Sequence, residues 1–527
     1  MNVSSSIRLA SFCFLFLLTR HPAMARMYEC RPSAPKADQE QFETSANGLQ
    51  PGDELTVHAG TYSQDGRRTV TVKGTPDRPI VIRAPEGESP LFTAGPRNNC
   101  IEFIDCAHVV IRGLRFRGGS SGVRFIRGEH VTFEDCEIFE TQNNALTMNS
   151  GNCHAFVVRR NHIHHTGLNT SRPTEGEGMY IGCHDGSCRT TGSIFEGNYI
   201  HHTRGTSDGG NDGIEIKFGS SGNIVRNNVI HDTNIERKYP GIFVYGGGPG
   251  TNVVEGNVIW HAGEGIQVVS DAVVRNNIIF DCEATGITAA PHAAMPQVRN
   301  VTIVNNTIFN APVGVRMRWA KSTNAVFANN AIYCPSGSAI IADTGSALLR
   351  RNYLHGGAAG VAIDHRQWFS GGEAMAAFVD AMKNDFWPRA GSPLIGNADP
   401  TLAPELDFNG TKRAPPCDVG AYETDNHEQN IGWRIEPGFR KTSGRSSPST
   451  STAVSQWRVA DQPHLRQELE NASILKTESL GEPARGVNVW ERWFVPNHDG
   501  KSWDLLQVYF KEYYGPTWLC AVDFGSS

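Results

Sequence analysis

Short runs of alternating apolar and polar residues recur along most of the chain. Between Gly213 and Lys217, two isoleucines alternate with Glu215 and Lys217. This pattern places the isoleucines on one face of a strand and the charged residues on the other. We therefore predict short strands, most of them beginning at a glycine, over residues 122–125, 145–149, 178–181, 213–217, 241–245, 265–268, 286–288 and 314–318.

A second motif places an asparagine two residues before an isoleucine or leucine of the expected core. Its copies run from Asn161 to Asn352, 191 residues in seven intervals, or about 27 residues per repeat, which is within the solenoid range. Asparagine tolerates the left-handed backbone of a tight bend, and identical amides stacked coil on coil form a hydrogen-bonded ladder. The repeat predicts a β-coil with a ladder formed by Asn161, Asn198, Asn228, Asn257, Asn277, Asn306, Asn330 and Asn352.

The outward residues of the first strand series should form one continuous row. Parallel strands one coil apart lie about 4.8 Å from each other, so side chains at equivalent positions follow one another like the units of a polymer. A row of aromatic and cationic groups edged by acids would suit an extended anionic chain. It comprises Arg124, Thr147, Asn149, Tyr180, Glu215, Lys217, Phe243, Tyr245, Gln267, Thr288, Arg316 and Arg318.

The chain divides into four segments. Residues 1–25 have the pattern of a secretory signal, because Arg8 precedes a short apolar run and residues 23–25 form a small-residue cleavage site. We expect the β-coil over residues 26–425, with an amphipathic capping helix at 372–383. A Ser/Thr/Gly/Pro-rich linker follows over 426–455, and residues 456–527 form a small aromatic-rich extension.

The charge balance and the signal restrict the partners. The 527 residues carry a formal net charge of −6, and removing residues 1–25 takes away two arginines and gives −8. A net-negative exported protein is a poor candidate for sequence-independent nucleic-acid binding. No stretch after the signal is long and apolar enough to span a bilayer. We expect a secreted monomer.

The cysteines predict one small loop and several thiols. Removing the signal leaves 11 of 12 cysteines, so at least one is unpaired in an oxidising compartment. Cys183 and Cys188 flank four residues and favour a disulfide, although a zinc site formed with His184 is the alternative. Cys136 and Cys282 occupy core positions of the repeat, which predicts buried free thiols.

Taken together, the asparagine repeats, the strands at 178–182 and 213–217, and the closing sequence Asp418–Glu423 resemble the right-handed parallel β-helix family. This pectate-lyase-like superfamily comprises secreted polysaccharide-active proteins, and the resemblance covers about residues 45–425. It implies an all-β, single-stranded, right-handed parallel β-helix. The superfamily includes lyases, hydrolases, epimerases and non-catalytic adhesins, so the resemblance specifies the fold more closely than the activity.

A sharper local match surrounds Asp212-Gly213-x-x-x-Lys217, which stands before a Gly-Asn turn. It resembles the calcium-dependent pectate lyases that use lysine as a base. The resemblance implies that Asp212 helps to hold calcium and that Lys217 removes the sugar proton. Those lyases carry further aspartates in the next coil, where this chain has Gly241-Ile242-Phe243-Val244-Tyr245.

The chemistry of uronate cleavage defines the candidate site. β-Elimination needs a base for the C5 proton and positive charge near the carboxylate. Lys217 could be that base if its surroundings lower its pKa; a lysine paired with Glu215 or Asp212 on a solvated face is the alternative. The candidate catalytic residues are Lys217, Glu215 and Arg316, the last as a carboxylate clamp. Candidate calcium ligands are Asp208, Asp212 and Glu215, and candidate substrate-binding residues are Tyr180, Phe243, Tyr245, Arg318, Lys238 and His184.

Two classes of function remain open. The first is a secreted lyase that cleaves an acidic polysaccharide, with a paired-carboxylate glycoside hydrolase as a variant. The second is a non-catalytic β-helix that binds glycans or lies at a cell surface. The enzyme needs Lys217 and a cation site close together in a groove, whereas the binding protein needs only the aromatic and basic row.

Overall fold

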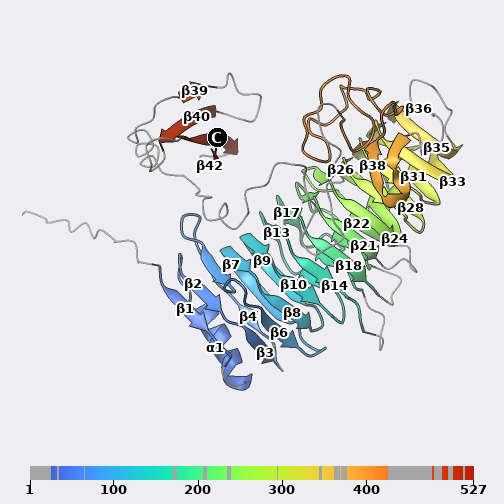
Figure 1. The fold of residues 1–527 in the computed structure, drawn as a ribbon. Coiled ribbons are helices and arrows are strands. Elements are labelled where there is room, and N and C mark those ends of the chain that lie inside the picture. The colour runs from blue at the N-terminus through green and yellow to red at the C-terminus, as the bar shows by residue number, and fades with distance from the viewer. Residues whose placement is uncertain are drawn as a thin grey trace, which may run out of the picture.

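A long stack of short parallel strands dominates the computed structural model of the chain (Figure 1). The described residues are 25–32, 35–64, 66–169, 175–205, 210–233, 239–293, 295–343, 347–360, 368–369 and 377–424, with four strands beyond residue 476. The colours of Figure 1 run in order along the stack, so the chain advances steadily from one end to the other. This arrangement confirms the predicted parallel β-helix.

Each coil contributes strands to three faces, which we call the site face, the ladder face and the back face. The site face comprises β11 (Leu146–Met148), β15 (Met179–Ile181), β19 (Ile214–Ile216), β22 (Pro240–Val244), β25 (Glu264–Val268), β28 (Thr285–Ala289) and β31 (Val313–Arg318). The ladder face comprises β3 (Gly60–Gln64), β6 (Pro90–Ala94), β8 (Arg115–Gly118), β10 (Glu137–Phe139), β14 (His162–His164), β18 (Tyr199–Thr203), β21 (Val229–Thr233), β24 (Val258–Ala262), β27 (Ile278–Phe280) and β30 (Thr307–Phe309).

The back face completes each coil. It comprises β1 (Met27–Cys30), β2 (Glu54–Val57), β5 (Ile80–Arg83), β13 (Val157–Arg159), β17 (Ile194–Glu196), β20 (Ile224–Arg226), β23 (Asn252–Glu255), β26 (Ser270–Arg275), β29 (Arg299–Val304), β32 (Thr323–Ala328) and β34 (Leu348–Arg350). Longer strands that continue from one face onto the next are β7 (Ile101–Arg112), β9 (Val123–Glu134), β33 (Ala331–Asp343) and β35 (Asn352–Ala359). Short additional strands are β4 (Thr69–Val70), β12 (Cys153–His154), β16 (Thr190–Thr191) and β36 (Trp368–Phe369).

The asparagine ladder is confirmed in full. Each side-chain amide donates to the side-chain oxygen of the next asparagine, without a break from Asn161 to Asn352. Every member of the ladder is almost completely buried. The ladder therefore satisfies polar groups at one corner of the coil where no water reaches them.

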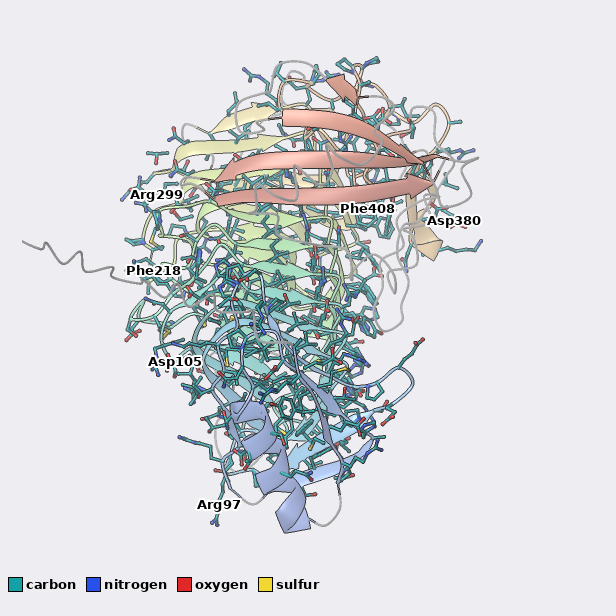
Figure 2. The ribbon with its side chains drawn as sticks, turned by 90° about the vertical axis from the view of Figure 1, so that its left-hand side faces the viewer. Arg97, Asp105, Phe218, Arg299, Asp380 and Phe408 are labelled. Carbon is teal, nitrogen blue, oxygen red and sulfur yellow. A yellow bond between two sulfur atoms is a disulfide. The ribbon has the colours of Figure 1, made fainter. Side chains whose placement is uncertain are left out.

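The corners of the coil need a left-handed backbone. Asn227, one residue before the ladder, has φ 56°, and Asn276 has φ 53°. Asp105 (φ 52°) marks another corner and lies at the edge of the stack in Figure 2. Asparagine and aspartate adopt this conformation more readily than other residues with a Cβ, which explains their recurrence at these positions.

The isoleucines that follow the ladder form a column in the core. Ile163, Ile200, Ile230 and Ile259 are register partners on successive strands of the ladder face, and all are fully buried. Cys136 and Cys282 are buried free thiols, as predicted. The core is thus one continuous apolar column along the stack.

The N-terminal end of the stack is closed by α1 (Pro35–Asn47), a helix that the sequence analysis missed. It packs against β1, β3 and β4. Phe42 of α1 lies 6.3 Å from Tyr62 and 4.8 Å from Phe92, measured between ring centroids. These contacts cover the core of the first coils.

Residues 372–376 of the helix predicted over 372–383 lie outside the described residues, and Ala377 is helical, but from residue 378 onward the chain is not an α-helix. There the chain forms β37 (Phe378–Asp380) and a 3-10 turn (Ala381–Lys383), followed by β38 (Asp385–Pro388). The two strands pair antiparallel, and Asn384 turns the chain between them at φ 61°. Phe378 and Phe386 both pack into an aromatic cluster against the ladder face, a requirement of tertiary packing that overrides helical periodicity.

Beyond residue 476 the described strands form their own antiparallel sheet. It comprises β39 (Thr477–Ser479), β40 (Val489–Pro496), β41 (Trp503–Tyr513) and β42 (Thr517–Ser526). The predicted signal and linker, except Ala25, lie outside the described residues. Within the described part of the chain, no helix has the length and apolar character that crossing a lipid bilayer requires.

Candidate functional site

The outward row of the site face is confirmed by the strand register. On successive coils, Thr147, Tyr180 and Glu215 are direct register partners. The same row continues in register through Phe243, Gln267, Thr288 and Arg316, and it begins at Arg124. The apolar–polar alternation within each strand therefore also predicts which outward side chains are neighbours on successive coils.

Three buried carboxylates meet at the centre of this row. Glu177 and Asp212 precede the glycines that lead into β15 and β19, and Glu215 points outward from β19. One oxygen from each lies within 4.8 Å of the other two, and all three side chains are buried. We call Glu177, Asp212 and Glu215 the carboxylate cluster.

The carboxylate cluster carries more negative charge than its surroundings neutralise. Burial, together with the Glu215 and Asp212 charges, raises the pKa of Glu177 well above its ordinary value. Burial and Glu215 do the same to the pKa of Asp212. In addition, Glu177 Oε1 and Asp212 Oδ1 are buried without a hydrogen-bond donor among the described residues. The cluster is therefore suited to bind protons or a cation.

Lys217 provides the positive charge beside the carboxylate cluster. Its ammonium donates to Glu215 Oε1, and it lies 4.3 Å from the ring centroid of Tyr180 and 5.3 Å from that of Tyr245. Although burial lowers the pKa of Lys217, Glu215 and its other neighbours raise it above its ordinary value. The expected pairing with Glu215 is present, but the site is buried rather than solvated, and the pKa is raised rather than lowered.

An aromatic wall borders Lys217 on the next coil. The rings of Phe243 and Tyr245 stack with centroids 4.1 Å apart, and His292 lies 4.8 Å from Tyr245. His184 lies 6.2 Å from Tyr245 and is exposed. Phe243, Tyr245 and Lys217 are buried, so the centre of the row is covered, whereas His184 at its border is exposed.

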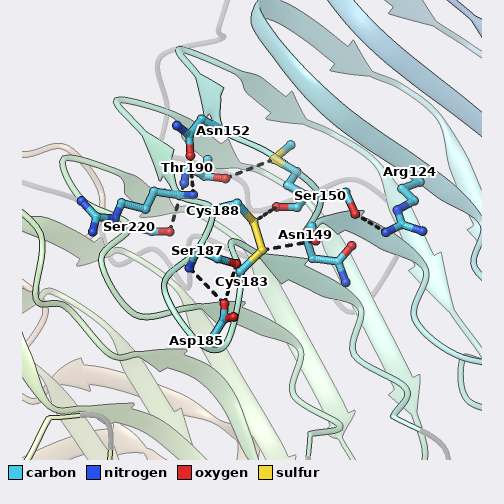
Figure 3. The surroundings of a disulfide bond; sticks show 12 residues. Arg124, Asn149, Ser150, Asn152, Cys183, Asp185, Ser187, Cys188, Thr190 and Ser220 are labelled. Carbon is cyan, nitrogen blue, oxygen red and sulfur yellow. Dashed lines mark hydrogen bonds between the residues drawn. A yellow bond between two sulfur atoms is a disulfide. The ribbon is translucent and has the colours of Figure 1, made fainter.

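His184 belongs to a loop closed by the Cys183–Cys188 disulfide (Figure 3). The Cys183 amide donates to the Cys188 carbonyl at 3.0 Å, and Asp185 accepts from the Ser187 hydroxyl at 2.6 Å. The disulfide confirms the predicted pairing. The alternative zinc site at Cys183, His184 and Cys188 is wrong, because both sulfurs are already bonded.

Some predicted site residues are not brought together with Lys217. Arg316 lies four register steps from Glu215, or about 19 Å along the stack at the spacing of paired strands. Arg316 and Lys217 therefore do not belong to one compact site. Arg318 is exposed at the same distant strand and faces Asp343 in register. Asp208 and Lys238 lie outside the described residues.

Glu177 is the residue that the sequence analysis missed. Met179 pairs with Ile214, so Glu177-Gly178 occupies the position of Asp212-Gly213 one coil earlier. The shared acid-glycine pair before an alternating strand was the available signal. Once the two strands are aligned, Glu177 becomes the partner of Asp212.

Several solved structures are similar to the chain at low sequence identity. Pectate lyase Pel9A is 14% identical, with 76% of this chain and 97% of that chain covered and a TM-score of 0.46. The alginate lyase from Paenibacillus sp. str. FPU-7 is 19% identical, with 55% of this chain and 99% of that chain covered and a TM-score of 0.43. The A-module of the Azotobacter vinelandii mannuronan C-5 epimerase AlgE6 is 15% identical, with 66% of this chain and 100% of that chain covered and a TM-score of 0.49. A search of curated protein sequences finds no match to the chain.

A family assignment comes from the sequence itself. The profile described as "Pel9A-like, right handed beta helix region" matches residues 32–324. These residues include the carboxylate cluster, Lys217 and the aromatic wall, as well as most of the asparagine ladder. Because the match spans more than half of the 527 residues, the chain belongs to the Pel9A-like right-handed β-helix family.

Proposed function

We propose that this protein is a secreted polysaccharide lyase that cleaves a uronate-containing polysaccharide by β-elimination. The observation that carries the proposal is the buried lysine beside three carboxylates on the outward row of the site face. A lysine and a cation-binding group of acids are the two elements that the reaction needs. Membership of the Pel9A-like family, with residues 32–324 matched, supports the same reading.

The carboxylate cluster fits a calcium ion. Calcium prefers hard oxygen ligands, especially carboxylates, and Glu177 Oε1 and Asp212 Oδ1 lack a donor among the described residues. A Cβ on Gly210 would lie only 1.9 Å from Glu177 Oε1, so glycine leaves room at that oxygen. Glu177, Asp212 and Glu215 would hold the ion. When bound, calcium supplies positive charge next to a uronate carboxylate and so makes the C5 proton more acidic.

Lys217 is the proposed base. In the elimination, the C5–H bond breaks and its proton passes to the amine, while the electron pair forms the C4–C5 double bond. As that double bond forms, the C4–O bond breaks, and the departing oxygen takes up a proton from water or from the protonated Lys217. Because Glu215 raises the pKa of Lys217, its pair with Glu215 must open and the ammonium must release a proton to solvent before the amine can accept the C5 proton. Activity should therefore depend strongly on what occupies the carboxylate cluster.

Accessible residues along the same row would contact the polymer on either side of the reacting unit. Arg124, Gln267 and Arg316 are all partly exposed. Arg124 lies three register steps from Glu215 on one side and Arg316 four steps on the other, so each can meet a carboxylate several sugars away from the reacting unit. Arg316 is thus better suited to bind a distant uronate than to take part in the chemistry.

A glycoside hydrolase is the less favoured alternative. Paired carboxylates of glycosidases are about 5–5.5 Å apart in retaining enzymes and about 6.5–9.5 Å apart in inverting ones. The oxygens of the carboxylate cluster lie within 4.8 Å of one another. This close grouping suits joint cation binding better than an acid and a nucleophile on two sides of a sugar.

The deciding experiment measures ultraviolet absorbance from unsaturated uronates. The purified protein is incubated with pectate, alginate and glycosaminoglycans, each with calcium and with a chelator. We expect absorbance to rise on one polymer and only with calcium. New reducing ends without absorbance would indicate a hydrolase, and binding without either product would indicate a non-catalytic glycan-binding β-helix.

Variants then test the role of Lys217. Lys217→Ala should lower turnover by about 10² to 10⁴, because a general base is lost, and should leave polymer binding largely intact. Lys217→Arg should also be poor, since a guanidinium keeps its proton. Arg226→Ala is the matched control, because Arg226 pairs with Glu196 on the back face. Turnover of Lys217→Ala equal to that of the control would refute the proposed base.

A further inference from the structure

A group of histidines lies on the ladder face, separate from the carboxylate cluster. His162 and His164 flank the core residue Ile163 on β14, and His201 is the register partner of His164 on β18. Their side chains therefore point outward from neighbouring coils. We call His162, His164 and His201 the histidine cluster. All three are half-buried, so they are held by packing and are still accessible to solvent.

Ring nitrogens of the histidine cluster converge on one point. One nitrogen from each residue lies within 4.8 Å of the other two. His162 Nε2 and His201 Nε2 are 2.9 Å apart. A tetrahedral zinc ion with bonds of about 2.0–2.1 Å holds its ligand atoms about 3.3 Å apart. A shift of a few tenths of an ångström would bring this pair to that spacing.

The remaining nitrogens are backed by neighbouring polar groups. His201 Nδ1 lies 2.7 Å from His202 Nδ1, and His162 Nδ1 lies 3.8 Å from Glu137 Oε1. Glu137 Oε1 is also 3.1 Å from His164 Nε2. Metal-binding histidines usually have their second nitrogen held by a carboxylate or another polar partner, which fixes the ring orientation. Glu137 and His202 provide such support here.

Protonation of His162 and His201 is unfavourable at this site. Burial and the neighbouring histidines lower the pKa of His162 to about 4 and that of His201 to about 2. Neutral imidazole is the form that binds metals.

We propose that His162, His164 and His201 form a binding site for a divalent transition metal of the zinc class. Imidazole nitrogens suit zinc, copper, nickel and iron, whereas calcium prefers oxygen ligands. This site and the carboxylate cluster therefore select different ions, and the proposal does not rest on the proposed lyase activity. A water molecule completes the coordination.

Simple ring stacking is the competing explanation. His201 stacks on His231 at 5.0 Å, and His231 stacks on Trp260 at 4.4 Å, which continues the column along the ladder face. His108 and His130 also stack, at 4.7 Å. Among the described residues, however, the His108–His130 pair is not part of a converging group of three ligands. Stacking alone explains the column but not the convergence of three nitrogens.

The test is metal binding by the full-length protein, purified without a polyhistidine tag and stripped with a chelator. Co²⁺ is titrated in the presence of excess calcium while visible absorption is followed, and zinc is then added to displace it. We expect one equivalent of Co²⁺ to give the absorption of a low-coordinate nitrogen site. Zinc should abolish that absorption.

Two ligand variants, one variant of the supporting carboxylate and one control test the site. His201→Asn and His162→Gln should each weaken Co²⁺ binding by more than about 100-fold, and Glu137→Gln by about 10- to 100-fold. His130→Asn, from the stacked pair outside the cluster, should bind like the wild type. Circular dichroism confirms that each variant is folded. If one of the two ligand variants does not fold, the other still tests the proposal. No binding by the wild type, or equal binding by both ligand variants and the control, would overturn the proposal.

Discussion

Replacing Asn228 by alanine tests whether the asparagine ladder holds the coils together. The Asn228 side chain makes four hydrogen bonds at 2.9–3.0 Å. Its amide donates to the Asn257 side chain and the Phe195 carbonyl, and its oxygen accepts from the backbone and side chain of Asn198. All four are buried and connect three successive coils.

The expected loss of folding stability depends on which buried polar groups keep a hydrogen-bond partner in the variant. The Asn198 side chain still donates to the Val158 carbonyl, and Asn257 still accepts from the backbone of residue 228. The backbone N–H of Asn198, by contrast, loses the acceptor that Asn228 provides. An orphaned buried donor costs about 1–3 kcal/mol, and each remaining bond contributes about 0.5–1.5 kcal/mol net. One orphaned donor and three further lost bonds lead us to expect that Asn228→Ala lowers the free energy of unfolding by about 2.5–7.5 kcal/mol.

Denaturant unfolding followed by circular dichroism measures this loss. Gln297→Ala is the control, because Gln297 is exposed and makes one hydrogen bond, to the Lys321 carbonyl. Its free energy of unfolding should change by less than about 0.5 kcal/mol. Asn228→Asp should be at least as damaging as Asn228→Ala, since it buries a charge and removes the donor. An Asn228→Ala variant as stable as the control would refute the view that the ladder stabilises the stack.

Two further predictions concern the cysteines and the carboxylate cluster. In the native, unreduced protein, alkylation followed by mass spectrometry should find Cys183 and Cys188 unlabelled, because they form a disulfide. Cys136 and Cys282 should be labelled only after unfolding, since both are buried. Labelling of Cys183 in the native protein would contradict the pairing. The raised pKa values of Glu177 and Asp212 mean that the folded state binds more protons than the unfolded state. The two carboxyl groups therefore contribute to the stability of the folded state below about pH 4, and this contribution is lost as the pH rises through their raised pKa values. In chelator, Glu177→Gln should raise the melting temperature at pH 7 and change it little at pH 4; added calcium should stabilise only the wild type at pH 7.

The repeat made most of the fold predictable from sequence. A ladder asparagine and its following isoleucine fix both the corner and the core position of each coil, so stacking Asn161 to Asn352 also places the site-face strands in register. Thr147, Tyr180 and Glu215 are neighbours for this reason. The ends of the stack were harder, because they do not repeat. At 378–386, burial of Phe378 and Phe386 determines a strand pair where the periodicity indicated a helix.

The carboxylate cluster was only partly predictable because two coils build it. Glu177 and Asp212 are 35 residues apart in sequence, and the intervening insertion hides that they are one coil apart in space. Arg316 shows the opposite error. It shares the outward row with Glu215, but the row extends over many coils, so a common face did not mean a common site.

The burial of Lys217 arises from three coils at once. Tyr180 comes from the coil before it and Tyr245 from the coil after it, and both rings face its ammonium. An isolated strand with lysine on its outward face gives no sign of this. Three buried carboxylates beside one ammonium are unfavourable for stability, because desolvated charges are only partly compensated. A stack held by a continuous hydrogen-bonded ladder can tolerate such a site, and local departures from stable patterning are expected where a protein binds or reacts. The excess of acid around Lys217 is thus the strongest physical reason to look for the protein's chemistry on this coil.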